Sequence, residues 1–135
     1  MLRRRLSRCA AVAVAFSLSA GLLPPAAQAQ PAPGGAMLLT VNPGERPKPD
    51  AERATLTCSP LGGSHPLRAA ACAELVRANG DISAVSIDPQ RPCHLIYSPV
   101  TVTANGRWNG RQISYRETFP NNCVLDVIKG PLFRF

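Results

Sequence analysis

Cysteine spacing sets the strongest constraint on how this 135-residue chain folds. Cys9 lies in an apolar leader, and the other four cysteines are Cys58, Cys72, Cys93 and Cys123. An even number of cysteines in a small exported domain is typical of disulfides, and four cysteines allow three connectivities. Once the leader is removed, the sequence therefore predicts a small domain that contains two disulfides.

The first 29 residues have the three parts of a secretory signal peptide. Arginines among residues 3–8 form a basic start, and an apolar run follows from residue 9 to residue 23. That run is shorter than the ~20 apolar residues that span a bilayer, and Pro24-Pro25 ends it. Ala27-Gln28-Ala29 has the small-residue pattern of a cleavage site. We therefore predict that residues 1–29 are removed and that the mature protein is secreted, extracellular and free of the membrane.

Removal of the signal peptide also changes the charge of the protein. Four arginines leave with it, so the formal charge falls from +7 to +3. A mild charge without clustered Lys and Arg gives no case for a nucleic-acid partner. Residues 30–36, rich in Pro and Gly, are expected to form a flexible lead-in, and residues 37–135 have the length of one domain.

Local patterns predict an α+β domain with an antiparallel sheet. A helix is expected to begin near Pro66, with Ser64 or His65 at its cap, and to stop at Asn79-Gly80. A second, short helical segment is expected to be capped by Pro120-Asn121-Asn122 and to run through Lys129. Strands are expected at residues 37–41, 51–58, 100–103 and 112–119, with a closing edge strand at 131–135.

Two details of these elements stay open to test. Asn105-Gly106 and Asn109-Gly110 both suit the hairpin turn before the last long strand, and the sequence does not say which one makes it. In the longer helix, helical spacing predicts a buried stripe that consists of Ala69, Cys72, Ala73 and Val76, with Leu75 beside it.

The chain is poorly equipped for catalysis. It has two histidines, His65 and His94, and no G-x-S-x-G turn that would present a nucleophilic serine. Neither C-x-x-C nor H-x₃₋₅-H is present, and disulfides would consume the thiols, so no metal site or other cofactor is expected. A secreted hydrolase is therefore a weak alternative, and we expect that the protein is not an enzyme.

The segment from Pro92 to Pro99 is the most unusual stretch of the chain. Proline biases the residue before it towards extended backbone, and a cross-linked Cys93 would hold one end. Short apolar runs such as Leu95-Ile96-Tyr97 are more often buried strands. A proline on each side, however, disfavours a central strand. The alternative is an exposed, extended segment of the kind that fits a serine protease cleft, with one side chain in the S1 pocket.

The sequence resembles the Streptomyces subtilisin inhibitor family of secreted, standard-mechanism serine protease inhibitors. The resemblance runs through nearly all of the mature chain. Its matching segments are Leu56-Thr57-Cys58-Ser59-Pro60, Gly63-Ser64-His65-Pro66, Ala70-Ala71-Cys72, Cys93-His94-Leu95-Ile96-Tyr97-Ser98-Pro99-Val100, Gly106-Arg107-Trp108-Asn109-Gly110, Ser114-Tyr115, Thr118-Phe119, Asn122-Cys123 and Phe133-Arg134-Phe135.

The resemblance implies a fold and a partner. The fold would be a five-stranded antiparallel sheet with two helices and the disulfides Cys58–Cys72 and Cys93–Cys123. The protein would form a homodimer through its sheet, and its partners would be extracellular, subtilisin-like serine proteases.

It also implies a reactive bond between Leu95 and Ile96, with Leu95 as the P1 residue. The rest of the protease-contact loop would be Pro92, Cys93, His94 and Tyr97. The family commonly has Pro where this chain has His94, and often Met or Lys in place of Leu95. The first departure bears on the rigidity of the loop and the second on target choice.

An inhibitor with leucine at P1 is expected to act strongly on subtilisin, more weakly on chymotrypsin and poorly on trypsin. The alternative function is a non-inhibitory, secreted binding module that contacts its partner through the hairpin from Arg107 to Arg116. Arginines at a hairpin are more often simply solvated.

Overall fold

The computed structural model describes residues 26–135. The predicted signal peptide therefore lies outside the described residues, apart from its last four positions. The domain runs from Pro31 to Phe135. Within the described part of the chain, none of the helices has the length and apolar character needed to cross a lipid bilayer.

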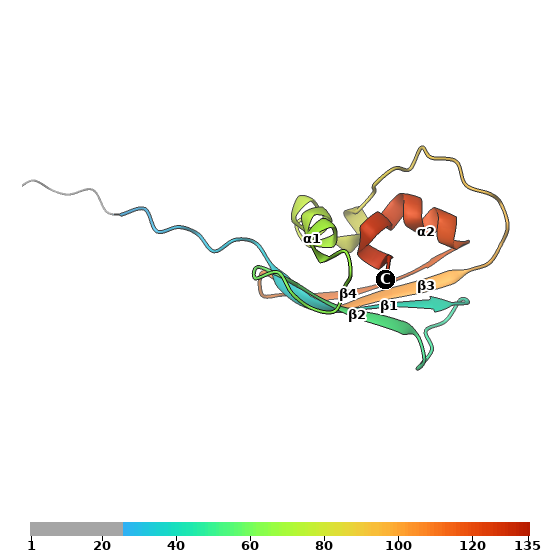
Figure 1. Cartoon of the computed structure of the whole chain (residues 1–135), viewed down its shortest axis with the longest axis horizontal. Helices are drawn as coiled ribbons and strands as arrows, with labels where there is room; N and C mark the ends of the chain where they lie inside the picture. The colour runs from blue at the N-terminus through green and yellow to red at the C-terminus, as the bar shows by residue number, and fades with distance from the viewer. Residues whose placement is uncertain (1–25) are drawn as a thin grey trace, which may run out of the picture. The chain divides into compact units, whose positions relative to one another are not determined.

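A four-stranded antiparallel sheet forms the body of the domain. The strands are β1 (Gly35–Pro43), β2 (Glu52–Cys58), β3 (Val100–Trp108) and β4 (Arg111–Phe119), in the spatial order β2-β1-β3-β4. The helices are α1 (Arg68–Arg77) and α2 (Asn122–Lys129), and two 3-10 turns, η1 (Ile82–Ala84) and η2 (Gly130–Phe133), complete the fold. Both helices lie over one face of the sheet (Figure 1).

Alternation along the strands explains this layering. Side chains of a strand point to opposite faces in turn, so one set meets the helices and the other meets solvent. The inward set forms the core together with residues of the helices and turns. Its fully buried large members are Leu39, Leu56, Leu75, Ile82, Val102, Trp108 and Leu132.

The expected fifth strand is wrong. The first three residues of the predicted edge strand, 131–133, belong to the turn η2 instead. There Pro131 lacks the N–H that a strand would donate, and Gly130 adopts a φ of +49°. Leu132 and Phe133 are buried in the core, so apolar burial rather than strand pairing fixes this segment. Beyond the four strands, the pairing found in the described residues is a single bridge between Thr57 and Gly62.

The hairpin between β3 and β4 turns at Asn109-Gly110. Both residues have positive φ, +47° and +78°, as a two-residue type I′ turn requires. Asn105-Gly106 instead lies inside β3. A Cβ at Gly106 would come within 2.2 Å of the Ala36 carbonyl oxygen, so this glycine allows β1 to approach β3 closely.

The predicted cap of α2 is correct, whereas the buried stripe predicted for α1 is only partly correct. Asn121 caps α2 as expected, because its side chain accepts a hydrogen bond from the N–H of Val124. The stripe predicted for α1 is only partly correct, since the buried residues are Ala71, Cys72 and Leu75, and Val76 is 45% exposed. The disulfide from Cys72 to Cys58 on β2 and the packing of η2 fix the rotation of this short helix.

One buried cation joins α2 to the segment after α1. Lys129 is 2% exposed, and its Nζ donates to the carbonyl oxygens of Ile82 (2.8 Å) and Val85 (3.0 Å). Burial lowers the pKa of its ammonium group. These hydrogen bonds hold the start of the long connection to β3 against α2.

Candidate functional site

The segment from Pro92 to Pro99 lies at the surface and has no regular secondary structure. Leu95 is 99% exposed, and Ile96 and Tyr97 are 67% and 65% exposed. The buried-strand interpretation of this apolar run is therefore wrong. In Figure 1 the yellow and orange connection that leads into β3 arches outward beside α2.

The remaining predicted contact residues flank Leu95 on the same connection. Pro92 and His94 are exposed, and Cys93 is half-buried because its side chain joins Cys123 on α2. The two disulfides, Cys58–Cys72 and Cys93–Cys123, have the pairing that the resemblance implied. The second disulfide fixes the backbone two residues before Leu95.

The Asn121 side chain hydrogen-bonds to the backbone of the segment from Pro92 to Pro99. Its side chain is 3% exposed, and its Nδ2 donates to the carbonyl oxygens of His94 (3.2 Å) and Ile96 (3.0 Å). Its Oδ1 accepts from the Val124 N–H at 3.0 Å, so the same side chain also caps α2. One amide group thus connects the first turn of a rigid helix to the carbonyl groups on both sides of Leu95.

Further hydrogen bonds and an ion pair hold the two ends of the segment. On the C-terminal side, the Ser98 N–H donates to the Pro120 carbonyl oxygen at 2.8 Å. On the N-terminal side, Arg91 pairs with Asp126 of α2 at 2.5 Å. Arg134 also donates to Asp126, and the two guanidinium groups lower the pKa of this carboxyl group.

The loop between β1 and β2 supports the C-terminal half of the segment. The Tyr97 hydroxyl donates to Glu45 at 2.5 Å, and the Gly44 N–H donates to the Pro99 carbonyl oxygen at 2.7 Å. Thr101 donates from its hydroxyl to the Gly44 carbonyl oxygen, also at 2.7 Å. The hydrogen bond to Glu45 raises the pKa of the Tyr97 phenol.

Sequence reasoning missed Glu45 entirely and found only half of the role of Asn121. A cap signal beside Pro120 identified Asn121 as a helix start. Its contacts with residues 25 and 27 positions away in sequence depend on tertiary structure alone. Glu45 lies in a charged, proline-rich stretch of the sequence that carries no signal for a contact with Tyr97.

The histidines are not arranged for catalysis. His65 is buried, its Nδ1 accepts from the Leu67 N–H at 3.0 Å, and its Nε2 lies 3.1 Å from the Leu132 carbonyl oxygen. Burial lowers the pKa of this imidazole, so its neutral form is favoured. His94 is exposed beside the disulfide-bonded Cys93. Both histidines therefore occupy structural or surface positions.

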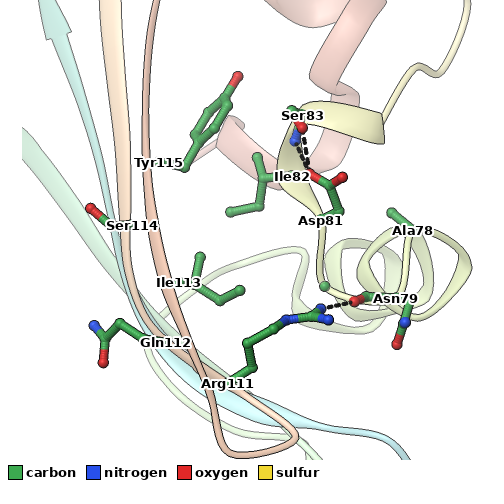
Figure 2. Close-up of a pocket in the computed structure, with 11 residues that line it drawn as sticks. Ala78, Asn79, Asp81, Ile82, Ser83, Arg111, Gln112, Ile113, Ser114 and Tyr115 are labelled. Atoms are coloured by element: carbon green, nitrogen blue, oxygen red, sulfur yellow. Dashed lines mark hydrogen bonds between the residues drawn. The ribbon is translucent and has the colours of Figure 1, made fainter.

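A separate cavity of about 530 Å³ lies between residues 78–83 and the start of β4 (Figure 2). Arg111 crosses it and donates to the Asn79 carbonyl oxygen at 2.5 Å, while Asp81 accepts from Ser83. None of the residues that line it belongs to the segment from Pro92 to Pro99.

The hairpin arginines do not converge on a common site. Arg107 donates to the Gly110 carbonyl oxygen, Arg111 to that of Asn79, and Arg116 to that of Glu45. Each guanidinium group thus hydrogen-bonds to a different part of the backbone. This arrangement favours a solvated surface over the alternative binding face on the hairpin.

Comparisons with known proteins agree with this geometry. The family described as subtilisin inhibitor-like matches residues 33–121. Subtilisin inhibitor-like protein 5 of Streptomyces fradiae is 46% identical over 74% of this chain and 96% of its own length. The subtilase-type protease inhibitor of Streptomyces coelicolor is 45% identical over 74% of this chain and 72% of its own length.

A solved structure has the same architecture. Sermetstatin of Streptomyces caespitosus, crystallised in complex with Bacillus licheniformis subtilisin, superposes with a TM-score of 0.64 at 34% identity. The match covers 76% of this chain and 99% of sermetstatin. A family match over most of the domain, relatives at about 45% identity and a shared fold all point the same way. This chain therefore belongs to the subtilisin inhibitor-like family, whose named relatives are protease inhibitors and not enzymes.

Proposed function

We propose that the mature protein is a secreted, standard-mechanism inhibitor of subtilisin-like serine proteases, with Leu95 at P1 and the Leu95–Ile96 peptide bond as the reactive bond. One observation carries the proposal. Leu95 is 99% exposed at the centre of a segment whose backbone is tied on both sides to the folded domain. Leu95, Ile96 and Tyr97 together form a contiguous exposed apolar run, of the kind that marks a site of contact with another protein.

Preorganisation explains how such a segment would bind tightly. A flexible substrate loses backbone and side-chain freedom when it enters a protease cleft. Here the disulfide at Cys93, the Asn121 amide and the Ser98 N–H have already removed much of that freedom. Protease–inhibitor complexes of about 1,600 Å² include some of the tightest known, so nanomolar affinity or better is expected.

The same tethers explain why cleavage would stall. Attack of the protease serine on the Leu95 carbonyl carbon would break the bond to the Ile96 nitrogen and leave Leu95 as an acyl-enzyme. Cys93 holds the acyl side, and Asn121 and Pro120 hold the amine side through Ile96 and Ser98. The new amine would stay near the ester, so re-formation of the peptide bond would compete with hydrolysis.

Leu95 would set selectivity. An apolar, unbranched-Cβ side chain suits the hydrophobic S1 pockets of subtilisin-like and chymotrypsin-like proteases. It would leave the buried aspartate of a trypsin-like pocket unpaired, which costs about 1–3 kcal/mol or more.

Titration of subtilisin, chymotrypsin and trypsin with the mature protein tests the proposal. The inhibition constant should be smallest for subtilisin, larger for chymotrypsin and largest for trypsin. Leu95→Lys should shift potency towards trypsin and leave the melting temperature nearly unchanged. Mass spectrometry should locate any slow cut at Leu95–Ile96. Equal potency of the unaltered protein against trypsin and subtilisin would refute the assignment of Leu95.

The outer face of the sheet supports a homodimer as a finer part of this proposal. Leu38 is 40% exposed on that face, beside Thr55 of β2 and Asn105 of β3. Thr40 and Thr103 hydrogen-bond to each other across the same face at 2.6 Å. Short, uncharged side chains occupy the centre of the face, and Arg53 and Arg116 flank Thr40 and Thr103. Such a centre suits contact with a second copy.

A further inference from the structure

We infer that Glu45 is a positioning residue for protease recognition, because it fixes Tyr97 two residues after the reactive bond. This inference rests on the proposed function, since it concerns the same segment. The contact joins the loop between β1 and β2 to the side of the segment that follows Leu95. Glu45 and Tyr97 are 52 positions apart in sequence.

The loop that carries Glu45 is itself held in place. Asn42 is 1% exposed, its Oδ1 accepts from the Lys48 N–H at 2.7 Å, and its Nδ2 donates to the Arg46 carbonyl oxygen at 3.0 Å. Gly44 is bonded through its backbone to Pro99 and Thr101. The Glu45 carboxylate therefore projects from a fixed backbone, and the backbone contacts do not depend on its side chain.

Tyr97 is both accessible and restrained. Its side chain is 65% exposed, so a protease docked on Leu95 and Ile96 would meet it directly. Its hydroxyl proton is committed to Glu45. A bound protease would meet a ring of fixed orientation whose oxygen can still accept a hydrogen bond but has no proton left to donate. Proteases with apolar groups or donors at this position would suit it better than those with acceptors.

The expected effect follows from side-chain entropy. Immobilisation of a free side chain on binding costs about 0.5–1.5 kcal/mol, which is about a two- to twelvefold change in affinity. Glu45→Ala frees the Tyr97 ring and should weaken subtilisin inhibition by about three- to tenfold. Glu45→Gln keeps an acceptor for the hydroxyl and should recover most of the loss.

A double-mutant cycle with Tyr97→Phe tests the mechanism. Phenylalanine keeps the ring and removes the hydroxyl, so Glu45→Ala should have almost no further effect in the Tyr97→Phe protein. The inhibition constants are measured with subtilisin, and the melting temperatures of all variants should match that of the unaltered protein. Glu74→Ala is the matched control, because Glu74 pairs with Arg77 on α1 and contributes nothing to the segment.

The outcomes separate this inference from the proposed function. If the unaltered protein fails to inhibit subtilisin, the proposed function is wrong. If the unaltered protein inhibits subtilisin and the Glu45→Ala variant inhibits it equally well, the inference is overturned. The inference is also overturned if Glu45→Ala weakens inhibition by the same factor in the unaltered protein and in the Tyr97→Phe protein, because Glu45 then does not act through Tyr97. Loss of potency that Glu45→Gln does not restore would have the same consequence.

Discussion

At the scale of single residues, the Asn121 side chain works in two directions. Its oxygen caps α2 and its nitrogen donates to two carbonyl groups of the exposed segment. Asparagine can do this because its amide has an acceptor and a two-proton donor on one planar group. Serine or aspartate would cap the helix equally well but could not also make both of the other hydrogen bonds.

Asn121→Asp should separate these two roles. The variant keeps the capping oxygen and loses the Nδ2 donor, so the carbonyl groups of His94 and Ile96 lose their partner. Each lost hydrogen bond is worth about 0.5–1.5 kcal/mol, so loss of both should weaken subtilisin inhibition by about fivefold or more, and slow cleavage at Leu95–Ile96 should accelerate. Asn122→Asp, at an exposed neighbouring position, is the control. Equal inhibition constants for the two variants would contradict the role of Asn121.

His65 should make stability depend on pH. Burial lowers its pKa in the folded protein, whereas the unfolded chain titrates near the ordinary value of about 6.5. The unfolded state therefore binds the extra proton first, and the free energy of unfolding falls as pH drops below about 6.5, by up to about 1.4 kcal/mol per pH unit. Urea unfolding between pH 5 and pH 7.5 measures this slope. His65→Gln should flatten it, and His94→Ala should leave it intact.

Residue roles could be predicted only where a side chain acts through its own local sequence. The residues around Cys93 predicted that Leu95 is a contact residue, and Leu95 is 99% exposed. Asn121 and Glu45 act on positions 25 to 52 residues away, so neither spacing nor composition indicates their partners. The burial of His65 was likewise invisible, because its environment comes from the far end of the chain.

At the scale of elements, local backbone preference decided some predictions and tertiary packing decided others. The cap of α2 was correct because an Asn side chain satisfies an N–H three residues ahead. The prediction of a terminal strand was wrong. The five residues 131–135 are too few for their sequence pattern to show whether they pair with a neighbouring strand or pack into the core as a turn. For α1, the disulfide and the contact with η2 outweighed the weak apolar periodicity of an alanine-rich helix.

The two Asn-Gly pairs offer a matched test of why each glycine is needed. Gly110 has a φ of +78°, and a Cβ added there would meet nothing within 4 Å, so Gly110→Ala should cost about 1–2 kcal/mol from backbone strain alone. Gly106→Ala would place its Cβ against the backbone of Ala36 and Met37 and should cost several times more, or prevent folding. Chemical denaturation compares the two. A larger loss for Gly110→Ala than for Gly106→Ala would contradict the close approach of β1 to β3 at Gly106.

At the scale of the whole molecule, the sheet separates two surfaces. The helices cover one face, and α2 carries the tethers of the exposed segment. The other face carries Leu38 between Thr55 of β2 and Asn105 of β3. A homodimer formed through that face would therefore leave both copies free to bind a protease. The sequence predicted the α+β class, but it could not show which face of the sheet the helices cover and which face stays exposed to solvent.

Leu38→Arg tests the proposed dimer. A charge at the centre of a buried, self-complementary face would oppose itself across the two-fold axis, so the variant should be monomeric. Light scattering after size exclusion gives the molar mass of each protein. The unaltered protein should bind two protease molecules per dimer, and the variant should retain its inhibition constant. A monomeric mass for the unaltered mature protein would rule the dimer out.

The burial of Lys129 has a practical consequence. The chain has two lysines, and the other one, Lys48, is exposed on the loop that also carries Glu45. Amine-reactive dyes, biotin esters and activated sensor chips would therefore select Lys48 over Lys129, in competition with the α-amino group. Attachment through Lys48 would fix the molecule next to the segment from Pro92 to Pro99 and block protease access to that segment. Immobilisation should therefore use a tag placed elsewhere.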